Sequence, residues 1–225
     1  MRRLGGGLSR LLAEEIEHRI APDWTPARKA AILPPPSRAS AALPSSANRV
    51  RIIGGRFRGR IVRFPAEAGL RPTPDRVRET LFNWLGQRLD DQATLEPFAG
   101  TGVMSLEALS RGAARAVAID RSAALVRALA ATANTFGATG LETHVADARA
   151  WLARDTARYD VVFLDPPFAE DPWPWLFDAA ADRLAAGGRI YAEYGALLSP
   201  PARLTLLRHD RAGHVHYHLL ALAGR

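Results

Sequence analysis

The chain contains no cysteine, and it has only one lysine, Lys29, beside 29 arginines. Without cysteine, neither a disulfide framework nor a thiolate-ligated metal site can form. No apolar run approaches the roughly 18 residues of a membrane-spanning helix, and we expect a cytoplasmic protein that does not contact membranes. The 225 residues, of which 48% are hydrophobic, are enough for one sizeable core. Size and composition therefore favour one enzyme domain with appendages.

The excess positive charge is concentrated in one short stretch. The net charge is +7, and residues 49–80 hold nine arginines against three acidic residues. Part of this stretch predicts a twisted β-hairpin with a Gly-Gly turn and arginines flanking Phe57. Strand alternation would place Arg56, Arg58 and Arg60 on one face, where they suit a phosphate backbone with occasional base stacking. The alternative is a solvated basic face.

The tetrad Asp165-Pro166-Pro167-Phe168 abruptly ends the apolar run 159–164, which predicts a buried strand. Consecutive prolines cannot donate to a strand ladder and force a rigid extended turn. Such a turn holds a carboxylate and the following peptide carbonyls in fixed positions beside an aromatic ring. A planar exocyclic amine needs acceptors for its N–H groups and a ring that stacks on its base. The tetrad therefore indicates a site for modifying a nucleobase amine, the alternative being a strand-ending turn with a core phenylalanine.

A second motif lies upstream, where the run 95–102 (Leu-Glu-Pro-Phe-Ala-Gly-Thr-Gly) leads into a helical stretch over 103–109. A strand, a Gly-x-Gly turn and a helix form a nucleotide-type binding loop. Its glycines let the backbone approach a ligand, and the helix N-terminus favours polar or anionic groups. The next strand-like run ends at Asp120, 18 residues after Gly102, about where a carboxylate meets ribose hydroxyls.

Ser105 stands where a dinucleotide-binding loop would have its third glycine. The combination is better explained by S-adenosylmethionine than by NAD. The loop would hold the amino-acid part, Asp120 the ribose, and the tetrad would present the acceptor amine to the methyl group. Asp147, which follows the strand-like run 141–146, is a third acid at the same sheet edge and could meet the adenine amino group. It could also cap the helix that follows it, and both roles are compatible.

Strands and helices alternate along the chain, which predicts a parallel sheet covered on both faces. Before them we expect the hairpin, over residues 49–65, and a helix that Thr73 caps with Pro74 at its first position. That helix has a core face at every fourth residue, made of Val77, Leu81, Leu85 and Leu89. The alternating elements are expected at 94–97, 103–111, 116–120, 122–136, 141–146, 148–154, 159–164, 174–184 and 188–193. An antiparallel hairpin over 204–208 and 215–220 follows.

The two ends of the chain carry less information about function. Residues 1–48 are rich in Pro, Ala and Ser, a linker-like composition that predicts a disordered extension. His214, His216 and His218 alternate along the last expected strand. Their two-residue spacing would place all three on one solvent face, so we expect no metal site there.

Four segments resemble the RsmD family, the bacterial 16S ribosomal RNA guanine-N2 methyltransferases. They are the runs 51–55 (Arg-Ile-Ile-Gly-Gly), 70–84 (beginning Leu-Arg-Pro-Thr-Pro-Asp-Arg-Val-Arg-Glu-Thr), 98–102 and 165–168. The resemblance covers roughly residues 49–222, and the long Arg-Pro-Thr segment is highly specific. The chain departs from the family pattern at two acids, because Glu96 stands where the family usually has Asp and Asp120 where it has Glu. Both exchanges keep the charge and change the reach by one methylene.

The resemblance implies an α/β, Rossmann-like class I methyltransferase fold. Its mostly parallel sheet would carry a C-terminal antiparallel hairpin and follow a small N-terminal hairpin and helix. We expect residues 49–90 to face RNA and residues 91–225 to form the S-adenosylmethionine-dependent domain. The expected catalytic residues are Asp165, Pro166, Pro167 and Phe168. Cofactor contacts are expected from Glu96, Phe98, Ala99, Gly100, Thr101, Gly102, Asp120, Asp147 and Ala148. RNA contacts are expected from Arg56, Arg58, Arg60, Arg71, Thr73 and Arg76.

The implied reaction is direct methyl transfer by a monomer to a guanine of 16S ribosomal RNA in the small subunit or its precursor. Asp165 and the Pro166 carbonyl would accept hydrogen bonds from the N2 amine while Phe168 stacks on the extruded base. Positioning would then be the main catalytic term, and no metal is needed. Three alternatives stay open: an adenine-N6 methyltransferase on DNA or RNA, a protein-glutamine methyltransferase, and a non-catalytic RNA-binding assembly factor.

Overall fold

The computed structural model describes residues 48–67, 69–167 and 171–224. The predicted disordered extension therefore lies, apart from Asn48, outside the described residues, as does Phe168 of the tetrad. None of the helices within these ranges combines the length and the apolar character that crossing a bilayer would require.

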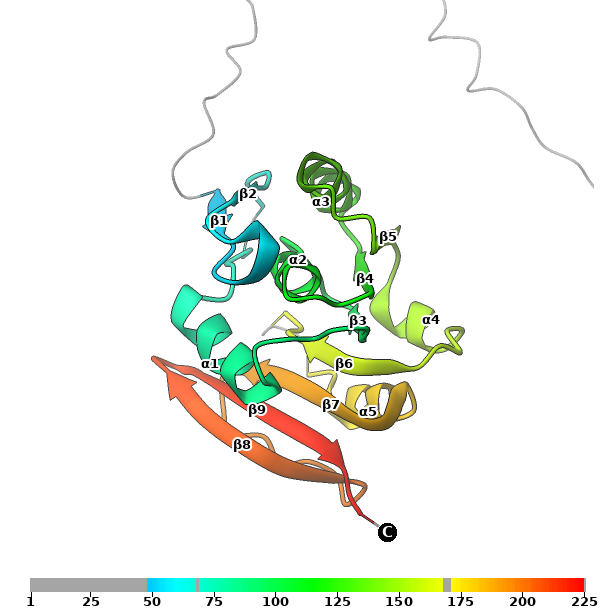
Figure 1. Ribbon diagram of the computed structural model, residues 1–225. Helices are drawn as coiled ribbons and strands as arrows, with labels where there is room; N and C mark the ends of the chain where they lie inside the picture. Colours follow the sequence, from blue (N-terminus) through cyan, green and yellow to red (C-terminus); the bar gives the residue numbers. More distant parts are fainter. Residues whose placement is uncertain (1–47, 68, 168–170, 225) are drawn as a thin grey trace, which may run out of the picture. The chain divides into compact units, whose positions relative to one another are not determined.

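A seven-stranded sheet forms the centre of the described part, in the order β5-β4-β3-β6-β7-β9-β8 (Figure 1). The first five of these strands are parallel, and β9 runs antiparallel to both β7 and β8. The expected mostly parallel sheet with a C-terminal antiparallel hairpin is thus confirmed. The strands are β3 (Ala93–Glu96), β4 (Arg115–Asp120), β5 (Leu141–Val145), β6 (Tyr159–Leu164), β7 (Leu184–Tyr194), β8 (Leu204–Ala212) and β9 (Val215–Leu222).

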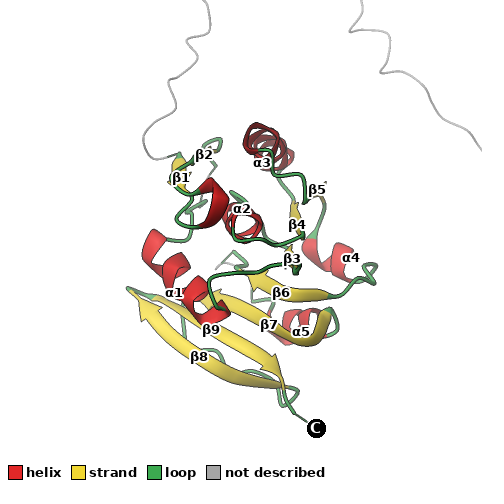
Figure 2. Ribbon diagram, in the orientation of Figure 1, coloured by secondary structure: helices red, strands yellow, loops and turns green. Residues whose placement is uncertain are grey.

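Helices cover both faces of this sheet, as Figure 2 shows by colour. On one face lie α1 (Asp75–Leu85), α2 (Val103–Ser110) and α3 (Ala123–Phe136), whose buried side chains share a core with Phe163 and Tyr191. On the other face lie α4 (Ala148–Leu152) and α5 (Trp173–Ala181), which pack on Val162 and Ile190. Because neighbouring residues of a strand point to opposite faces, the apolar runs of the central strands fill both cores.

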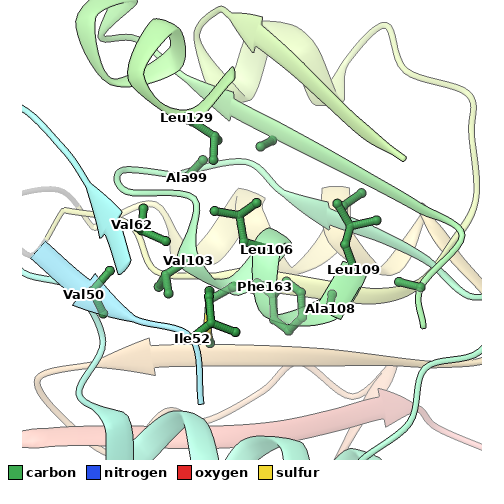
Figure 3. Close-up of a cluster of buried hydrophobic side chains, with 14 of the residues drawn as sticks. Val50, Ile52, Val62, Ala99, Val103, Leu106, Ala108, Leu109, Leu129 and Phe163 are labelled. Carbon is green, nitrogen blue, oxygen red and sulfur yellow. The ribbon is translucent and has the colours of Figure 1, made fainter. Parts of the chain in front are cut away.

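The core on the α2 face also anchors the N-terminal hairpin (Figure 3). Val50 and Val62 of the hairpin and Leu106 of α2 belong to the same buried cluster as Phe163 of β6. Full burial of one such side chain contributes about 1.5–3 kcal/mol. The hairpin therefore packs on the same core as the central sheet rather than forming a separate arm.

The hairpin itself differs from the prediction in its connection. β1 (Arg49–Arg51) and β2 (Ile61–Arg63) pair antiparallel as expected, but a 3-10 turn, η1 (Gly55–Phe57), lies between them. Phe57 is buried, and its ring lies 5.5 Å from that of Phe136 on α3. The prediction that Phe57 stacks on bases and that Arg56, Arg58 and Arg60 share one strand face is therefore wrong.

The start of α1 is also different from the expectation. Pro74, rather than Thr73, occupies the N-cap position, and no side chain caps the helix. The Thr73 hydroxyl instead donates to Oε1 of Glu193 at 2.9 Å. The predicted core face is confirmed at Val77 and Leu81, which are both buried, whereas α1 ends at Leu85, so that Leu89 is buried but lies beyond the helix.

The histidines of the last strand do not share a solvent face. His218 is fully buried, and its Nε2 accepts the Leu198 N–H at 3.1 Å. Burial lowers the pKa of His218 to about 4, so the ring is neutral near pH 7. His214 is exposed and His216 is half-buried. Among the residues that the structure describes, no group of three or more His, Cys, Asp or Glu side chains could hold a metal ion.

Candidate active site

A cavity of about 930 Å³ opens at the carboxyl ends of the parallel strands. It lies where β3 and β6 are neighbours and the chain continues from them toward opposite edges of the sheet, the usual ligand position in open α/β sheets. Four acids from four strand ends line it, namely Glu96, Asp120, Asp165 and Glu193. The segment 69–74 closes its other side, so the Arg-Pro-Thr motif belongs to the cavity wall.

The glycine loop between β3 and α2 is tightly fixed. Gly102 has a φ of 67°, which favours glycine, and a Cβ there would come within 2.3 Å of the Leu129 side chain. The Gly100 N–H donates to Oδ2 of Asp120 at 2.7 Å. Phe98, Ala99, Gly100 and Thr101 line the cavity, whereas Gly102 shapes the turn behind them.

Asp120 lies at the end of β4 and organises two backbone segments. Besides the Gly100 N–H, its carboxylate accepts the Ser122 N–H at 2.8 Å through Oδ1. Ser122 in turn caps α3, because its side chain accepts the Leu125 N–H. Each carboxylate oxygen keeps further acceptor capacity toward the cavity, so the carboxylate can still receive hydroxyl donors of a ligand.

Glu96 is buried at the end of β3, and Ser105 is its partner. The Ser105 N–H donates to Oε2 of Glu96 at 2.9 Å, and the Ser105 hydroxyl donates to the same oxygen. Burial raises the pKa of Glu96 to about 7, against the effect of these two bonds. The residue that replaces the third glycine of a dinucleotide loop thus has a defined role as the partner of a buried acid.

Asp165 and Glu193 lie side by side at the ends of β6 and β7. Leu164 pairs with Ala192, and continuing this parallel register sets Asp165 beside Glu193 on strands about 4.8 Å apart. Asp165 is exposed to the cavity, yet protein surrounds it on its other sides. This burial, together with the charges of Glu193 and Glu96, raises the pKa of Asp165 well above its usual range.

Glu193 is held by two hydroxyl groups. Thr73 and Tyr191 donate to its Oε1 at 2.9 and 2.8 Å. The side chain is only 4% exposed, and burial raises its pKa. Sequence analysis missed both Tyr191 and Glu193. The signal that pointed to Asp120, an acid at the carboxyl end of a parallel strand, was also available for Glu193.

The remaining expected cofactor residues lie at the end of β5. Ala148 lines the cavity. Asp147 caps α4 by accepting the Ala150 N–H at 2.9 Å, which confirms the capping role, and it forms an ion pair with Arg121 at 2.6 Å. Its contact with adenine stays a prediction. Pro166 and Pro167 line the cavity, and Phe168, the next residue, lies outside the described part.

The six residues selected for RNA contact occupy different environments. Arg71 lies at the cavity mouth, Thr73 is buried against Glu193, and Arg76 is exposed on α1. Arg56 and Arg58 are exposed, and neither forms an ion pair with a described carboxylate. Arg60 instead donates to the Thr135 and Phe136 carbonyls at the end of α3, at 2.7 and 3.1 Å.

A buried arginine joins the basic hairpin to the cavity wall. Arg78 of α1 is fully buried and donates to the Arg51 carbonyl at 2.8 Å, to the Thr73 carbonyl at 3.1 Å and to the carboxylate of Glu107 on α2. Glu107 also accepts the Ile53 N–H at 2.7 Å. Of the nine arginines counted in this stretch, Arg78 is thus the one whose charge is buried inside the protein.

A second cavity, of about 990 Å³, lies between the hairpin and the end of α2. Part of its charged lining is paired within the protein, Arg51 with Asp75 and Arg88 with Asp90, and Arg56 and Arg58 also line it. Its acids do not come from the carboxyl ends of parallel strands, so the first cavity remains the candidate active site.

Comparisons with known proteins identify the family and the fold of the chain. The model of a family described as conserved hypothetical protein 95 matches residues 50–221. Ribosomal RNA small subunit methyltransferase D of Escherichia coli (strain K12) is 39% identical over 180 residues, which cover 78% of this chain and 91% of that protein. A solved structure from Escherichia coli is 38% identical, covers 79% of this chain and 99% of its own, and superposes with a TM-score of 0.71.

A more distant solved structure, complexed with SAH, is 17% identical and covers 70% of this chain and 51% of its own, with a TM-score of 0.58. At this identity the likeness concerns the fold alone. Together with the strand order, these neighbours establish the fold as that of the class I methyltransferases.

Proposed function

The chain belongs to the RsmD family, and from that premise we propose that it methylates the N2 amine of a guanine in 16S ribosomal RNA. The methyl donor is S-adenosylmethionine, and the substrate is the small ribosomal subunit or its assembly precursor. Such a substrate places the enzyme in the cytoplasm, where it would act as a monomer. The observation that carries the proposal is Asp165, set before two prolines in a cavity that the strand-end acids Glu96, Asp120 and Glu193 also line.

The cavity suits S-adenosylmethionine in shape and charge. Gly100 and Leu70 both line the cavity, and a Cβ on Gly100 would lie only 2.9 Å from the Leu70 side chain. A glycine at this position therefore lets the loop and Leu70 approach each other closely. We assign the ribose hydroxyls to Asp120 and the amino-acid part to the loop 98–102, beside Glu96. A cavity rimmed by carboxylates also favours a cationic sulfonium group over a neutral ligand. When bound, the cofactor supplies an electrophilic methyl group.

The acceptor amine is placed by the turn after β6. Asp165 and the Pro166 carbonyl accept its two hydrogens, and this orients the nitrogen lone pair away from them, toward the methyl group. The prolines lock the turn, so the alignment needs little reorganisation when the base binds. We assign base stacking to Phe168 because it directly follows the turn in the sequence.

The proton balance gives the acids a second role. When the N2 nitrogen forms its bond to the methyl carbon, it must release one of its hydrogens as a proton. Asp165 accepts this proton, and its raised pKa makes it a stronger base than an ordinary aspartate. The order of proton and methyl transfer does not change the products, which are N2-methylguanine and S-adenosylhomocysteine.

An adenine-N6 methyltransferase is the second candidate, because adenine also presents an exocyclic amine to such a turn. One experiment separates the candidates. The purified protein is incubated with labelled S-adenosylmethionine and small-subunit particles that lack the modification, and the labelled nucleoside is identified. We expect N2-methylguanosine in the RNA. Label in N6-methyladenosine or in ribosomal protein would overturn the proposal, and absence of transfer despite cofactor binding would favour a non-catalytic assembly factor.

A further inference from the structure

Glu193 carries an unused acceptor into the cavity. The two hydroxyl bonds from Thr73 and Tyr191 both fall on Oε1. Oε2 receives no hydrogen bond from the described residues, although Glu193 lines the cavity. A carboxylate that is nearly buried and fixed on one side only is ready to accept one more donor on the other. The register of β6 and β7, which lie side by side in Figure 1, sets Glu193 beside Asp165.

We propose that Oε2 of Glu193 accepts the N1–H of the target guanine, and that Glu193 is thereby the residue that selects guanine over other bases. The proposal rests on the function proposed above, because it takes the N2 amine at Asp165 as its starting point. Thr73 and Tyr191 are then positioning residues, which turn the carboxylate so that Oε2 faces the base.

The hydrogen-bonding groups beside the exocyclic amine differ between the bases, and this difference explains the proposed selectivity for guanine. Guanine N2 is flanked by a ring N–H, at N1, whereas adenine N6 and cytosine N4 are flanked by ring nitrogens that only accept hydrogen bonds. A carboxylate beside the amine site can therefore accept a hydrogen bond from the N1–H of guanine. It repels the acceptor ring nitrogen that lies next to the amine in adenine or cytosine. Leaving such a buried acceptor unpaired is costly, and this cost allows a site to discriminate strongly between substrates.

The hydrogen bonds around Glu193 also favour the charged form that this role requires. Although burial raises its pKa, the Tyr191 and Thr73 hydroxyls act in the opposite direction. Asp165, by contrast, has no hydrogen bond that lowers its pKa among the causes of its shift. Of the two neighbouring acids, Glu193 is therefore the one whose charged form is stabilised by hydrogen bonds, and its negative charge attracts the N1–H.

The test uses Glu193→Gln and a base analogue. In this variant the amide oxygen can take the place of Oε1 and keep both hydroxyl bonds, so that an NH2 donor replaces Oε2. The analogue 2-aminopurine keeps the guanine 2-amine but has an acceptor at N1. Small-subunit particles are assembled on RNA that carries guanine, 2-aminopurine or adenine at the mapped target. For each substrate, kcat/KM is then measured with wild-type and variant enzyme.

We expect Glu193→Gln to lower kcat/KM on guanine roughly ten- to a hundred-fold and to shift the ratio of 2-aminopurine to guanine methylation upward by at least that factor. Because 2-aminopurine also lacks O6, only the change of the ratio between the two enzymes reports on N1. An unchanged ratio would overturn the proposal, even if both rates fell equally.

Two further variants separate positioning from general damage. Tyr191→Phe removes one of the two hydroxyl bonds and should shift the ratio in the same direction by a smaller factor, whereas Thr73→Ser keeps its hydroxyl and should leave the ratio unchanged. Thermal unfolding of each variant verifies the fold. If wild-type enzyme methylates adenine, the proposed function fails; if it makes N2-methylguanosine while the ratio is insensitive to residue 193, only the role of Glu193 fails.

Discussion

The carboxylate of Asp120 holds the glycine loop by accepting the Gly100 N–H at 2.7 Å. The acid at the end of β4 thus fixes the loop that follows β3 and, in the proposed complex, also binds the ribose. A single side chain therefore links the geometry of the glycine loop to affinity for the cofactor. Substitutions of Asp120 can therefore distinguish the effect of removing the whole carboxylate from the effect of removing only its charge.

We expect Asp120→Ala to weaken binding of S-adenosylmethionine roughly ten- to a hundred-fold, because a hydrogen bond to a carboxylate is worth on the order of 1.5–3 kcal/mol. Asp120→Asn keeps one acceptor oxygen for the Gly100 N–H and should lose less. Calorimetric titration of both variants measures the dissociation constants. Wild-type affinity in Asp120→Ala would show that another residue holds the ribose.

Asp165 should affect turnover without affecting cofactor affinity. We expect Asp165→Ala to lower single-turnover methyl transfer by at least roughly 10²-fold, the lower end for a positioned general base. Cofactor affinity should stay within a few-fold of wild type, because the loop and Asp120 are untouched. Removing an acid whose pKa is raised in the folded protein should not lower the melting temperature near pH 7. Near-normal turnover would contradict the role assigned to Asp165.

Glu96 should make stability depend on pH in a defined direction. Burial raises its pKa from 4.5 to about 7 in the folded protein, so the folded state binds the proton more tightly than the unfolded state. The contribution of Glu96 to stability is then fully present below about pH 4.5 and is lost as the pH rises to about 7. Over this range the loss amounts to about 3 kcal/mol for Glu96 alone.

Glu96→Gln serves as the reference for this effect, since its amide oxygen can accept both Ser105 donors and it has no charge to lose. Urea unfolding of both proteins at a series of pH values measures the difference in the free energy of unfolding. Wild type should lose stability relative to the variant between about pH 4.5 and pH 7. A difference that does not change with pH would mean that Glu96 titrates normally.

The parts of the site that the sequence predicted are those that strand geometry dictates. Glu96, Asp120 and Asp165 each directly follow or end a run of apolar strand residues, and parallel strands bring their carboxyl ends to one edge. The Gly-x-Gly loop was recognisable because it stands between a strand and a helix and is followed by an acid at the end of the next strand. These local signals do not depend on distant contacts, and the cavity gathers all of them.

The errors arose where a distant partner decides the local structure. Thr73 stands directly before Pro74, which is typical of a helix N-cap, but its hydroxyl instead donates to Glu193, 120 residues away in the sequence. Gly54 and Gly55 suggested a tight turn, yet they are there because α2 approaches so closely. A Cβ on Gly54 would lie 2.3 Å from the Arg111 guanidinium, and one on Gly55 would meet the Ser110 carbonyl at 1.8 Å. No local pattern encodes these contacts.

The exposed arginines of the hairpin provide the last prediction, because the structure separates them by role. Arg56 and Arg58 are free to contact phosphates, and each contact should add roughly 0.7–0.9 to the salt dependence of RNA binding. We expect the double variant Arg56→Gln, Arg58→Gln to bind small-subunit particles more weakly, with a slope of affinity against salt shallower by between about one and two. Arg154→Gln is the matched control, since Arg154 is exposed after α4, toward the amino ends of the strands.

Arg60→Gln should behave differently from its two neighbours. Arg60 donates hydrogen bonds to two backbone carbonyls at the end of α3, and its guanidinium lies 3.9 Å from the ring centroid of Phe136. Its loss should lower the free energy of unfolding by about 1–2 kcal/mol with little change in the salt slope. A binding series at several salt concentrations, run beside denaturant unfolding, measures both quantities for every variant. If the double variant kept the wild-type slope, the hairpin would be a solvated basic face, and RNA would bind through Arg71 and the cavity mouth instead.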